Sequence, residues 1–162
     1  MLVGVTTLAR ALLFFWALWL SIVALTNVLN GLQVLALLPD TFRFVSGNWS
    51  WINGTLDPLD VPRPLQALMF TAAILWEALA AMLYWRALVA YRGRSLAQEP
   101  AVIAASAVNL GLWAAFQVLD EVFLAYEPQA VHRDIFASQL LTILTLCVLP
   151  VTTKASEPGQ GV

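Results

Sequence analysis

The sequence predicts an all-α membrane protein, a four-helix transmembrane bundle with a long loop after its first helix. Of the 162 residues, 60% are hydrophobic and only 11% are charged, whereas roughly a quarter of the residues in an average soluble domain are charged. A chain of this size exposes much of its surface however it folds, so much of that surface must face lipid. Four apolar stretches are each long enough to cross a hydrocarbon core of about 30 Å.

The four predicted spans cover residues 8–30, 65–88, 101–125 and 135–153. Backbone groups inside a bilayer must be hydrogen bonded within their own segment, so we expect each span to be a helix. We expect the first to be a retained helix rather than a cleaved signal peptide. Residues 1–153 then form one transmembrane domain, and residues 154–162, rich in Gly, Pro and Ser, are predicted to be a disordered cytoplasmic tail.

Residues 31–64 form the long predicted loop on the outer side. Its apolar beginning, residues 31–38, is too short to cross the membrane again and either continues the first helix with a bend or lies at the interface. Prolines near its end mark the start of the second helix, and Pro100 marks the start of the third, because proline is tolerated in the first turn of a helix. The loop also contains Phe42, Phe44, Trp49 and Trp51, a composition typical of the lipid headgroup region. We therefore expect a cap folded over the outer end of the bundle.

The basic residues predict the orientation of the bundle. With four spans, both termini and the loop around residues 91–99 lie on one side of the membrane. That side carries five basic residues, Arg10, Arg86, Arg92, Arg94 and Lys154. The other side carries three, Arg43, Arg63 and Arg133. The positive-inside rule therefore places both termini in the cytoplasm.

Composition excludes several classes of function. The net charge is −2 and no basic run occurs, which excludes a nucleic-acid footprint. The single cysteine, Cys147, excludes an intrachain disulfide and a cysteine-based zinc or iron–sulfur site, and the single histidine, His132, excludes an intrachain bis-histidine haem. We expect His132 in a short solvated loop beside Arg133 and Asp134. Without a catalytic triad or a phosphate-binding loop, we expect no catalytic residue, no metal and no enzyme that acts alone.

Glu77 is the strongest candidate for a functional residue. It lies near the middle of the second span, where an ionised carboxylate costs several kcal/mol unless it is protonated, paired or hydrated. Small or inward-facing residues at helical spacing share its face and predict a surface for close helix contact. These residues are Ala73, Ala80, Ala81 and Tyr84.

The first and third spans carry further polar residues. In the third span the polar side chains lie on one side of the predicted helix, within about 120° of its circumference at 3.6 residues per turn. In the first span two asparagines lie about one turn apart. These intramembrane candidates are Asn27, Asn30, Asn109, Gln117, Asp120 and Glu121. We expect Asn27, Asn30, Asp120, Glu121 and Asp134 to cluster at outer depth, above Glu77. Such a cluster serves either as hydrogen-bonded adhesion between helices or as a polar path to a midplane carboxylate.

Three short motifs carry a resemblance to a known family. They are Ala24-Leu25-Thr26-Asn27-Val28-Leu29-Asn30 in the first span, Trp76-Glu77-Ala78-Leu79 in the second and Glu121-Val122-Phe123-Leu124 at the end of the third. With four spans and a large aromatic first loop, the chain resembles the bacterial predicted small integral membrane proteins, a family of unknown function. The resemblance implies a bacterial inner-membrane location and draws attention to Asn27, Glu77 and Glu121, but it implies no reaction.

These observations leave three functional hypotheses. The first is a non-catalytic accessory or assembly subunit that contacts lipid and other integral membrane subunits of a larger inner-membrane complex, for example an electron-transport complex. The second is a small proton or cation conductor or transporter that uses Glu77. The third is a quinone, haem or pigment site shared with a partner, in which tryptophans stack on the cofactor.

Overall fold

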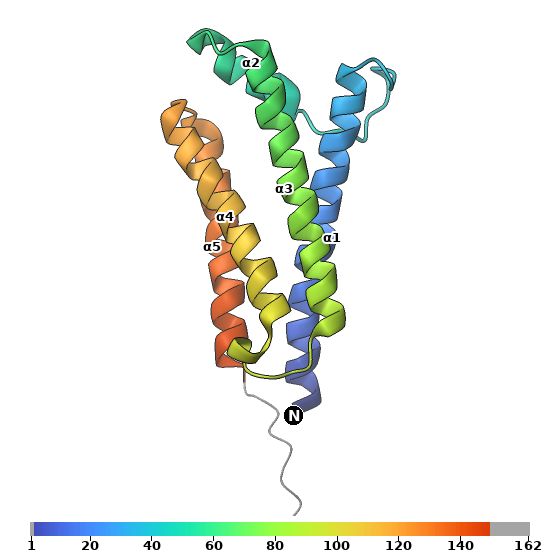
Figure 1. Cartoon of the computed structure of the whole chain (residues 1–162), viewed down its shortest axis with the longest axis vertical. Helices are drawn as coiled ribbons and strands as arrows, with labels where there is room; N and C mark the ends of the chain where they lie inside the picture. Colours follow the sequence, from blue (N-terminus) through green and yellow to red (C-terminus); the bar gives the residue numbers. More distant parts are fainter. Residues whose placement is uncertain (1, 150–162) are drawn as a thin grey trace, which may run out of the picture.

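The computed structural model describes residues 2–149 and shows a bundle of long helices (Figure 1). Its four long helices are α1 (Leu2–Val34), α3 (Arg63–Ala90), α4 (Pro100–Val122) and α5 (Tyr126–Val148). Between them lie the shorter helix α2 (Asn48–Leu56) and the 3₁₀ turns η1 (Asp57–Leu59) and η2 (Leu96–Gln98). No strand occurs within residues 2–149.

The four long helices are long and apolar enough to cross a membrane, which confirms the predicted all-α four-helix bundle. The shortest two have 23 residues each, a length of about 35 Å at 1.5 Å per residue. The predicted tail, 154–162, and the predicted end of the fourth span, 150–153, lie outside the described residues, as does Lys154.

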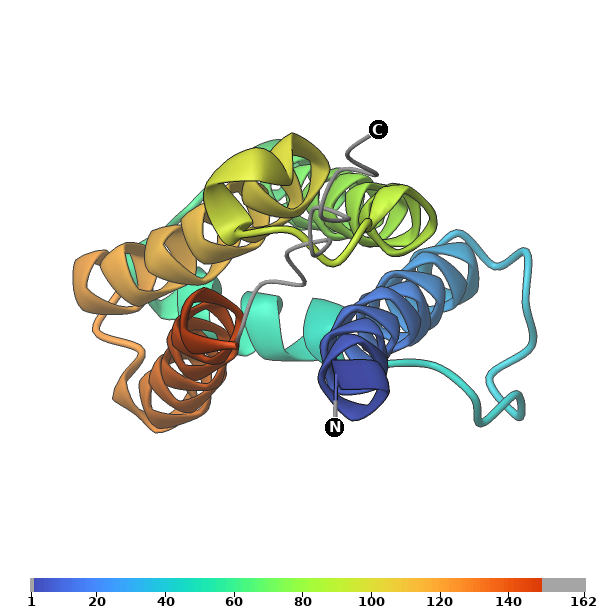
Figure 2. The ribbon, with the colours of Figure 1, turned by 90° about the horizontal axis from the view of Figure 1, so that it is seen from below.

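The long helices pack in chain order, α1 against α3, α3 against α4 and α4 against α5. Seen along its axis, the bundle consists of an α1–α3 pair and an α4–α5 pair (Figure 2). The two pairs are close at the end that holds the N-terminus and lean apart toward the end where α2 lies (Figure 1). We call these ends the N-terminal end and the α2 end.

The apolar core fills the N-terminal half of the bundle. Alanines contribute much of it, among them Ala9, Ala17, Ala80 and Ala105, together with Leu13 and Leu20. Small side chains let helix backbones approach closely, and in lipid close packing is a main source of helix association. The core therefore holds the two pairs together toward the N-terminal end, where they meet.

Helix α1 continues to Val34, which agrees with one of the two alternatives for residues 31–38. The prediction of a loop is wrong for residues 48–56, which form α2. The sequence of α2, Asn-Trp-Ser-Trp-Ile-Asn-Gly-Thr-Leu, contains several weak helix formers. Tertiary contacts compensate for them: Trp49 packs on Phe70 of α3 at 5.7 Å between ring centroids, and its backbone N–H donates to Asn30 Oδ1 at 2.9 Å.

The predicted boundaries of the last two helices also need correction. Helix α4 ends at Val122 instead of residue 125, and α5 begins at Tyr126 instead of residue 135. Glu127 and Pro128 occupy the first turn of α5, where an acidic side chain and a proline both favour a helix start. His132, Arg133 and Asp134 therefore lie on a helix and not in a loop.

Glu99 organises the loop between α3 and α4. Its side chain is only 4% exposed, and its Oε1 accepts hydrogen bonds from the backbone N–H groups of Arg92 (2.9 Å) and Arg94 (3.1 Å).

The pKa of Tyr91, in the same loop, is raised above its usual value. Burial of the side chain and the nearby charge of Glu99 raise this pKa, and the charge of Arg10 offsets part of the increase. Tyr91 is therefore neutral near pH 7, and its contribution to stability is lost only as the pH rises through the raised pKa.

Replacement of Glu99 by alanine is expected to loosen this loop and to cost about 1–2 kcal/mol, because two partly buried N–H groups lose an acceptor that water only partly replaces. Trypsin cleavage after Arg92 and Arg94 should be faster in Glu99→Ala than in the unsubstituted protein. Glu99→Gln, which keeps an acceptor oxygen, is the control and should be cleaved at an intermediate rate. Equal cleavage rates for all three proteins would contradict this role of Glu99.

Candidate functional site

A half-enclosed cavity of about 330 Å³ lies between the two helix pairs toward the α2 end. All five α-helices contribute to its walls, and α2 covers it with one face, through Asn48, Trp51, Ile52, Thr55 and Leu56. Most of the lining is apolar. Three lining residues are titratable: Glu77 of α3, Asp120 of α4 and His132 of α5; α1 and α2 contribute neutral side chains.

The Glu77 side chain is buried, with 3% of its surface exposed, and lies on the cavity wall. Its Oε2 accepts a hydrogen bond of 2.8 Å from Asn27 Nδ2 of α1. Within the part of the chain that the structure describes, this is its one hydrogen bond, and no basic side chain forms an ion pair with it. A carboxyl group in this position must be protonated, must meet a cation or must be hydrated through the cavity.

Asn27 connects Glu77 to the segment that precedes α2. Its Oδ1 accepts hydrogen bonds from Ser46 Oγ (2.6 Å) and Asn48 Nδ2 (2.8 Å), which leaves Nδ2 as the group that donates to Glu77. Three residues after Asn27, Asn30 Oδ1 accepts a hydrogen bond from the backbone N–H group of Trp49. The two asparagines of α1 therefore hold both the carboxyl group and the cover of the cavity.

On the opposite wall, Asp120 pairs with His132. Asp120 Oδ2 lies 2.7 Å from His132 Nδ1, and the Asp120 side chain is almost fully buried. The imidazole stacks on Phe116 at 4.9 Å between ring centroids and lies 5.7 Å from the ring of Trp113. The pair thus joins α4 to α5. Its two ionisable side chains line the cavity together with the two aromatic rings.

A layer of buried side chains forms the floor below the cavity. Trp113 Nε1 donates to Asn109 Oδ1 at 2.8 Å, and Asn109 Nδ2 donates to Gln139 Oε1 at 2.8 Å. Gln139 Nε2 in turn donates to the hydroxyl of Tyr84. This chain crosses from α4 through α5 to α3, and the apolar core continues below it. The cavity is therefore closed toward the N-terminal end.

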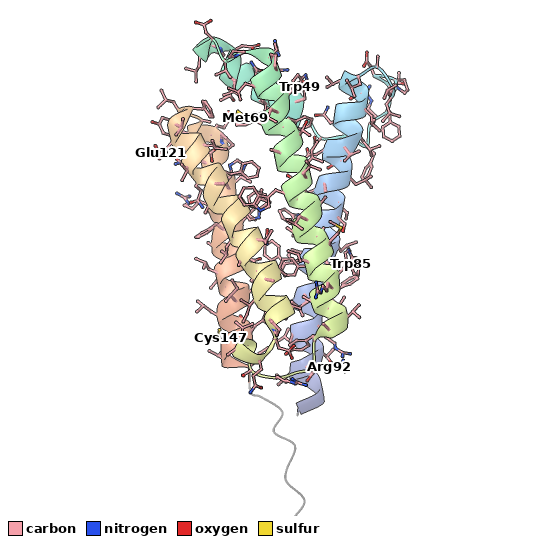
Figure 3. All side chains as sticks on the ribbon, viewed as in Figure 1. Trp49, Met69, Trp85, Arg92, Glu121 and Cys147 are labelled. Atoms are coloured by element: carbon pink, nitrogen blue, oxygen red, sulfur yellow. The ribbon has the colours of Figure 1, made fainter. Side chains whose placement is uncertain are left out.

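The structure separates the polar residues expected to cluster at outer depth. Asn27 and Asn30 face the segment before α2 and Asp120 faces His132, as described above. Glu121, by contrast, is exposed, accepts a hydrogen bond from Gln129 and lies on the side of α4 that faces away from α3 (Figure 3). Asp134 is exposed beside Arg133. The expected single cluster that includes Glu121 and Asp134 is therefore wrong.

The remaining candidates occupy other positions. Gln117 is half-buried and donates to the Trp113 carbonyl of its own helix. On α3, Ala80, Ala81 and Tyr84 are buried in the core, while Ala73 lines the cavity. Asn109 is fully buried in the floor.

Sequence reasoning missed two functional candidates, His132 and Gln139. Both belong to a stripe at helical spacing on α5: His132, Ile135, Gln139, Thr142 and Leu146. This spacing, together with the helix start signals at Glu127 and Pro128, was available in the sequence. The sequence predicted an aromatic cap that includes Trp51, and Trp51 lies on the cover of the cavity. The helical form of this cover had no such signal, because α2 does not follow a strong local pattern.

A comparison of the chain with models of known protein families, with characterised proteins and with solved structures found no match in any of the three.

Proposed function

We propose that the protein is a small membrane transporter that binds a cation in exchange for a proton at Glu77. The observation that carries this proposal is the Glu77 carboxyl group. It lines a cavity with Asn27 as its one described hydrogen-bond partner, and no basic side chain within residues 2–149 pairs with it. Of the three hypotheses drawn from the sequence, this geometry favours the second.

The exchange follows from the cost of burying charge. In an apolar surrounding the empty site favours the neutral, protonated carboxyl group, because an unpaired carboxylate is costly to bury. When a cation enters, the O–H bond of Glu77 breaks, the proton leaves to water and the cation pairs with the carboxylate. The net charge of the cavity stays the same, and Asn27 donates its hydrogen bond in both states.

The closed floor supports a transporter rather than an open conductor. In the conformation described here, the chain from Trp113 to Tyr84 and the core below it separate Glu77 from the N-terminal end. We propose that the cation enters from the α2 end and that release on the other side requires the two helix pairs to separate at this layer. Alternating access of this kind keeps the two solutions apart throughout.

We further propose that the protein lies in a bacterial inner membrane with both termini in the cytoplasm. Arg92 and Arg94 belong to the loop at the N-terminal end (Figure 3 labels Arg92), and Arg10 donates to the Tyr91 carbonyl at 3.4 Å. Basic residues favour the cytoplasmic side. The cavity would then receive its cation from the outside.

Proteoliposomes with an acidic interior and a trapped pH dye test the proposal. On addition of Na⁺, K⁺ or tetraphenylphosphonium outside, proteoliposomes of the unsubstituted protein are expected to lose protons faster than empty vesicles for at least one of the three cations. Glu77→Gln should abolish this increase, because the amide carries no exchangeable charge.

Glu121→Gln is the matched control, since Glu121 is an exposed acid of α4 outside the cavity. It should release protons at the same rate as the unsubstituted protein. If the unsubstituted protein releases protons no faster than empty vesicles with any of the cations, or if Glu77→Gln releases them as fast as Glu121→Gln, the proposal is wrong.

The accessory-subunit hypothesis and the hypothesis of a shared quinone, haem or pigment site stay predictions.

A further inference from the structure

We infer that the cation is a monovalent organic cation with an apolar body, such as a quaternary ammonium or phosphonium ion, rather than a metal ion. This inference rests on the proposed function, because it names the class of substrate that the Glu77 site takes. Three properties of the cavity support it: its aromatic walls, its volume and its balance of charge.

The aromatic rings of the cavity come from four helices and from the residue that follows α4. They are Trp51 of α2, Phe70 of α3, Trp113 and Phe116 of α4, Phe123 directly after α4, and His132 of α5, which stacks on Phe116. The faces of Trp and Phe rings attract cations, and aromatic cages recognise quaternary ammonium groups. Met69, which also lines the cavity and projects from α3 at this level (Figure 3), adds a flexible and polarisable side chain.

The ligand groups around Glu77 do not suit a metal ion. Calcium and magnesium ions need about six or more oxygen ligands, from protein or water. Within residues 2–149, no group of three or more His, Cys, Asp or Glu side chains is placed to hold a metal ion. The immediate polar neighbour of Glu77 is Asn27, and its amide directs an N–H group, not an oxygen, toward the carboxylate.

The volume of about 330 Å³ falls in the range of pockets that bind small organic molecules, roughly 300–1,000 Å³. It is about ten times the volume that one water molecule occupies in the liquid. An inorganic ion would fill a small part of this space and would leave the apolar walls against water. An organic cation places its charge near Glu77 and its apolar groups against the walls.

The charges that line the cavity indicate a single positive charge on the ligand. Asp120 has a titratable partner in His132 at 2.7 Å, whereas no titratable side chain within residues 2–149 pairs with Glu77. No charged side chain reaches the cavity from α1 or α2. Glu77, the one cavity carboxyl group without a titratable partner among the described residues, balances one cation.

Equilibrium binding of radiolabelled tetraphenylphosphonium to the purified full-length protein in a neutral detergent tests this inference. We expect saturable binding that phenyltrimethylammonium displaces. Its neutral isostere tert-butylbenzene, and the chlorides of sodium, potassium, magnesium and calcium, should displace the label much less well. These measurements need no variant.

Two matched tryptophan variants locate the ligand. Trp51 and Trp85 have similar exposed fractions, 39% and 37%, but Trp51 lines the cavity and Trp85 lies toward the N-terminal end (Figure 3). Trp51→Leu is expected to weaken binding about 2- to 30-fold, the range of one cation–π contact. Trp85→Leu should change it less than twofold. If Trp51→Leu fails to fold, Phe116→Leu takes its place.

The outcomes separate the two proposals. The assignment of an organic cation is wrong if a metal chloride or tert-butylbenzene displaces the label as effectively as phenyltrimethylammonium does. It is also wrong if tetraphenylphosphonium shows no saturable binding. Equal binding by Trp51→Leu and Trp85→Leu also overturns it. In each case the proposed function stands if Na⁺ or K⁺ still drives proton release that depends on Glu77. Unchanged binding in Glu77→Gln instead overturns the role of Glu77 and with it the proposed function.

Discussion

Replacement of Asn27 by leucine is expected to lower the free energy of unfolding by about 2–4 kcal/mol. The change removes three hydrogen bonds: the one that Asn27 donates to Glu77 and the two that it accepts from Ser46 and Asn48. Measured hydrogen bonds between membrane helices contribute on the order of 0.6–2 kcal/mol each, and a buried polar group left without its partner costs more than a bond that is never made. Reversible unfolding in mixed micelles measures the change.

A double-mutant cycle shows whether the loss acts through Glu77. Glu77→Met removes the carboxyl group that Asn27 serves, so Asn27→Leu should cost less in that background than in the unsubstituted protein. Asn48→Ala is the control, since it removes one of the bonds to Asn27 and leaves the bond to Glu77. Additive effects of Asn27→Leu and Glu77→Met would show that the 2.8 Å contact between them contributes nothing to stability.

Replacement of Gln139 by leucine is expected to cost about 2–5 kcal/mol. The Gln139 side chain is 0% exposed and uses both ends of its amide, toward Asn109 and Tyr84. Leucine in its place leaves the Asn109 amide and the Tyr84 hydroxyl buried without these partners, and each such group costs about 1–3 kcal/mol. The same unfolding assay measures the loss.

The position of Gln139 makes this effect specific. Among the described contacts, α5 packs mainly on α4, and its hydrogen bonds to the α1–α3 pair are those of Gln139 with Tyr84 and of Thr142 with Trp16. Gln129→Leu, at an outward position of the same helix, is the control and should change stability by less than about 0.5 kcal/mol. If the two leucine variants are equally stable, the polar floor does not hold the helix pairs together.

The position of Glu77 was predictable because it follows from the sequence near it. A carboxylate in the middle of a long apolar run is costly wherever the helix packs. Its partner was not predictable, because Asn27 lies 50 residues away in the chain. The stripe on α4 was likewise visible in the sequence, but helical spacing does not decide which edge of a stripe faces a neighbour. Asp120 turns inward to His132, and the adjacent Glu121 turns outward to Gln129.

Helix α2 and the start of α5 show two different reasons for error. The start of α5 carried local signals in Glu127 and Pro128, and the low hydropathy of residues 126–134 hid them. Helix α2 has no comparable local signal, and its contacts with α1 and α3 stabilise it. The cover of the cavity therefore exists only in the folded chain.

The sequence by itself determined the class of the protein, its four apolar helices and the residue most costly to bury, because the length of an apolar run and the cost of a charge within it are local properties. The tertiary structure alone decided that Glu77 meets Asn27, that Asp120 meets His132 and that aromatic side chains from α2, α3 and α4 line one cavity. These features arise where two helix pairs, held together by small residues at one end, separate at the other. That arrangement depends on contacts between segments far apart in the chain, which no local pattern specifies.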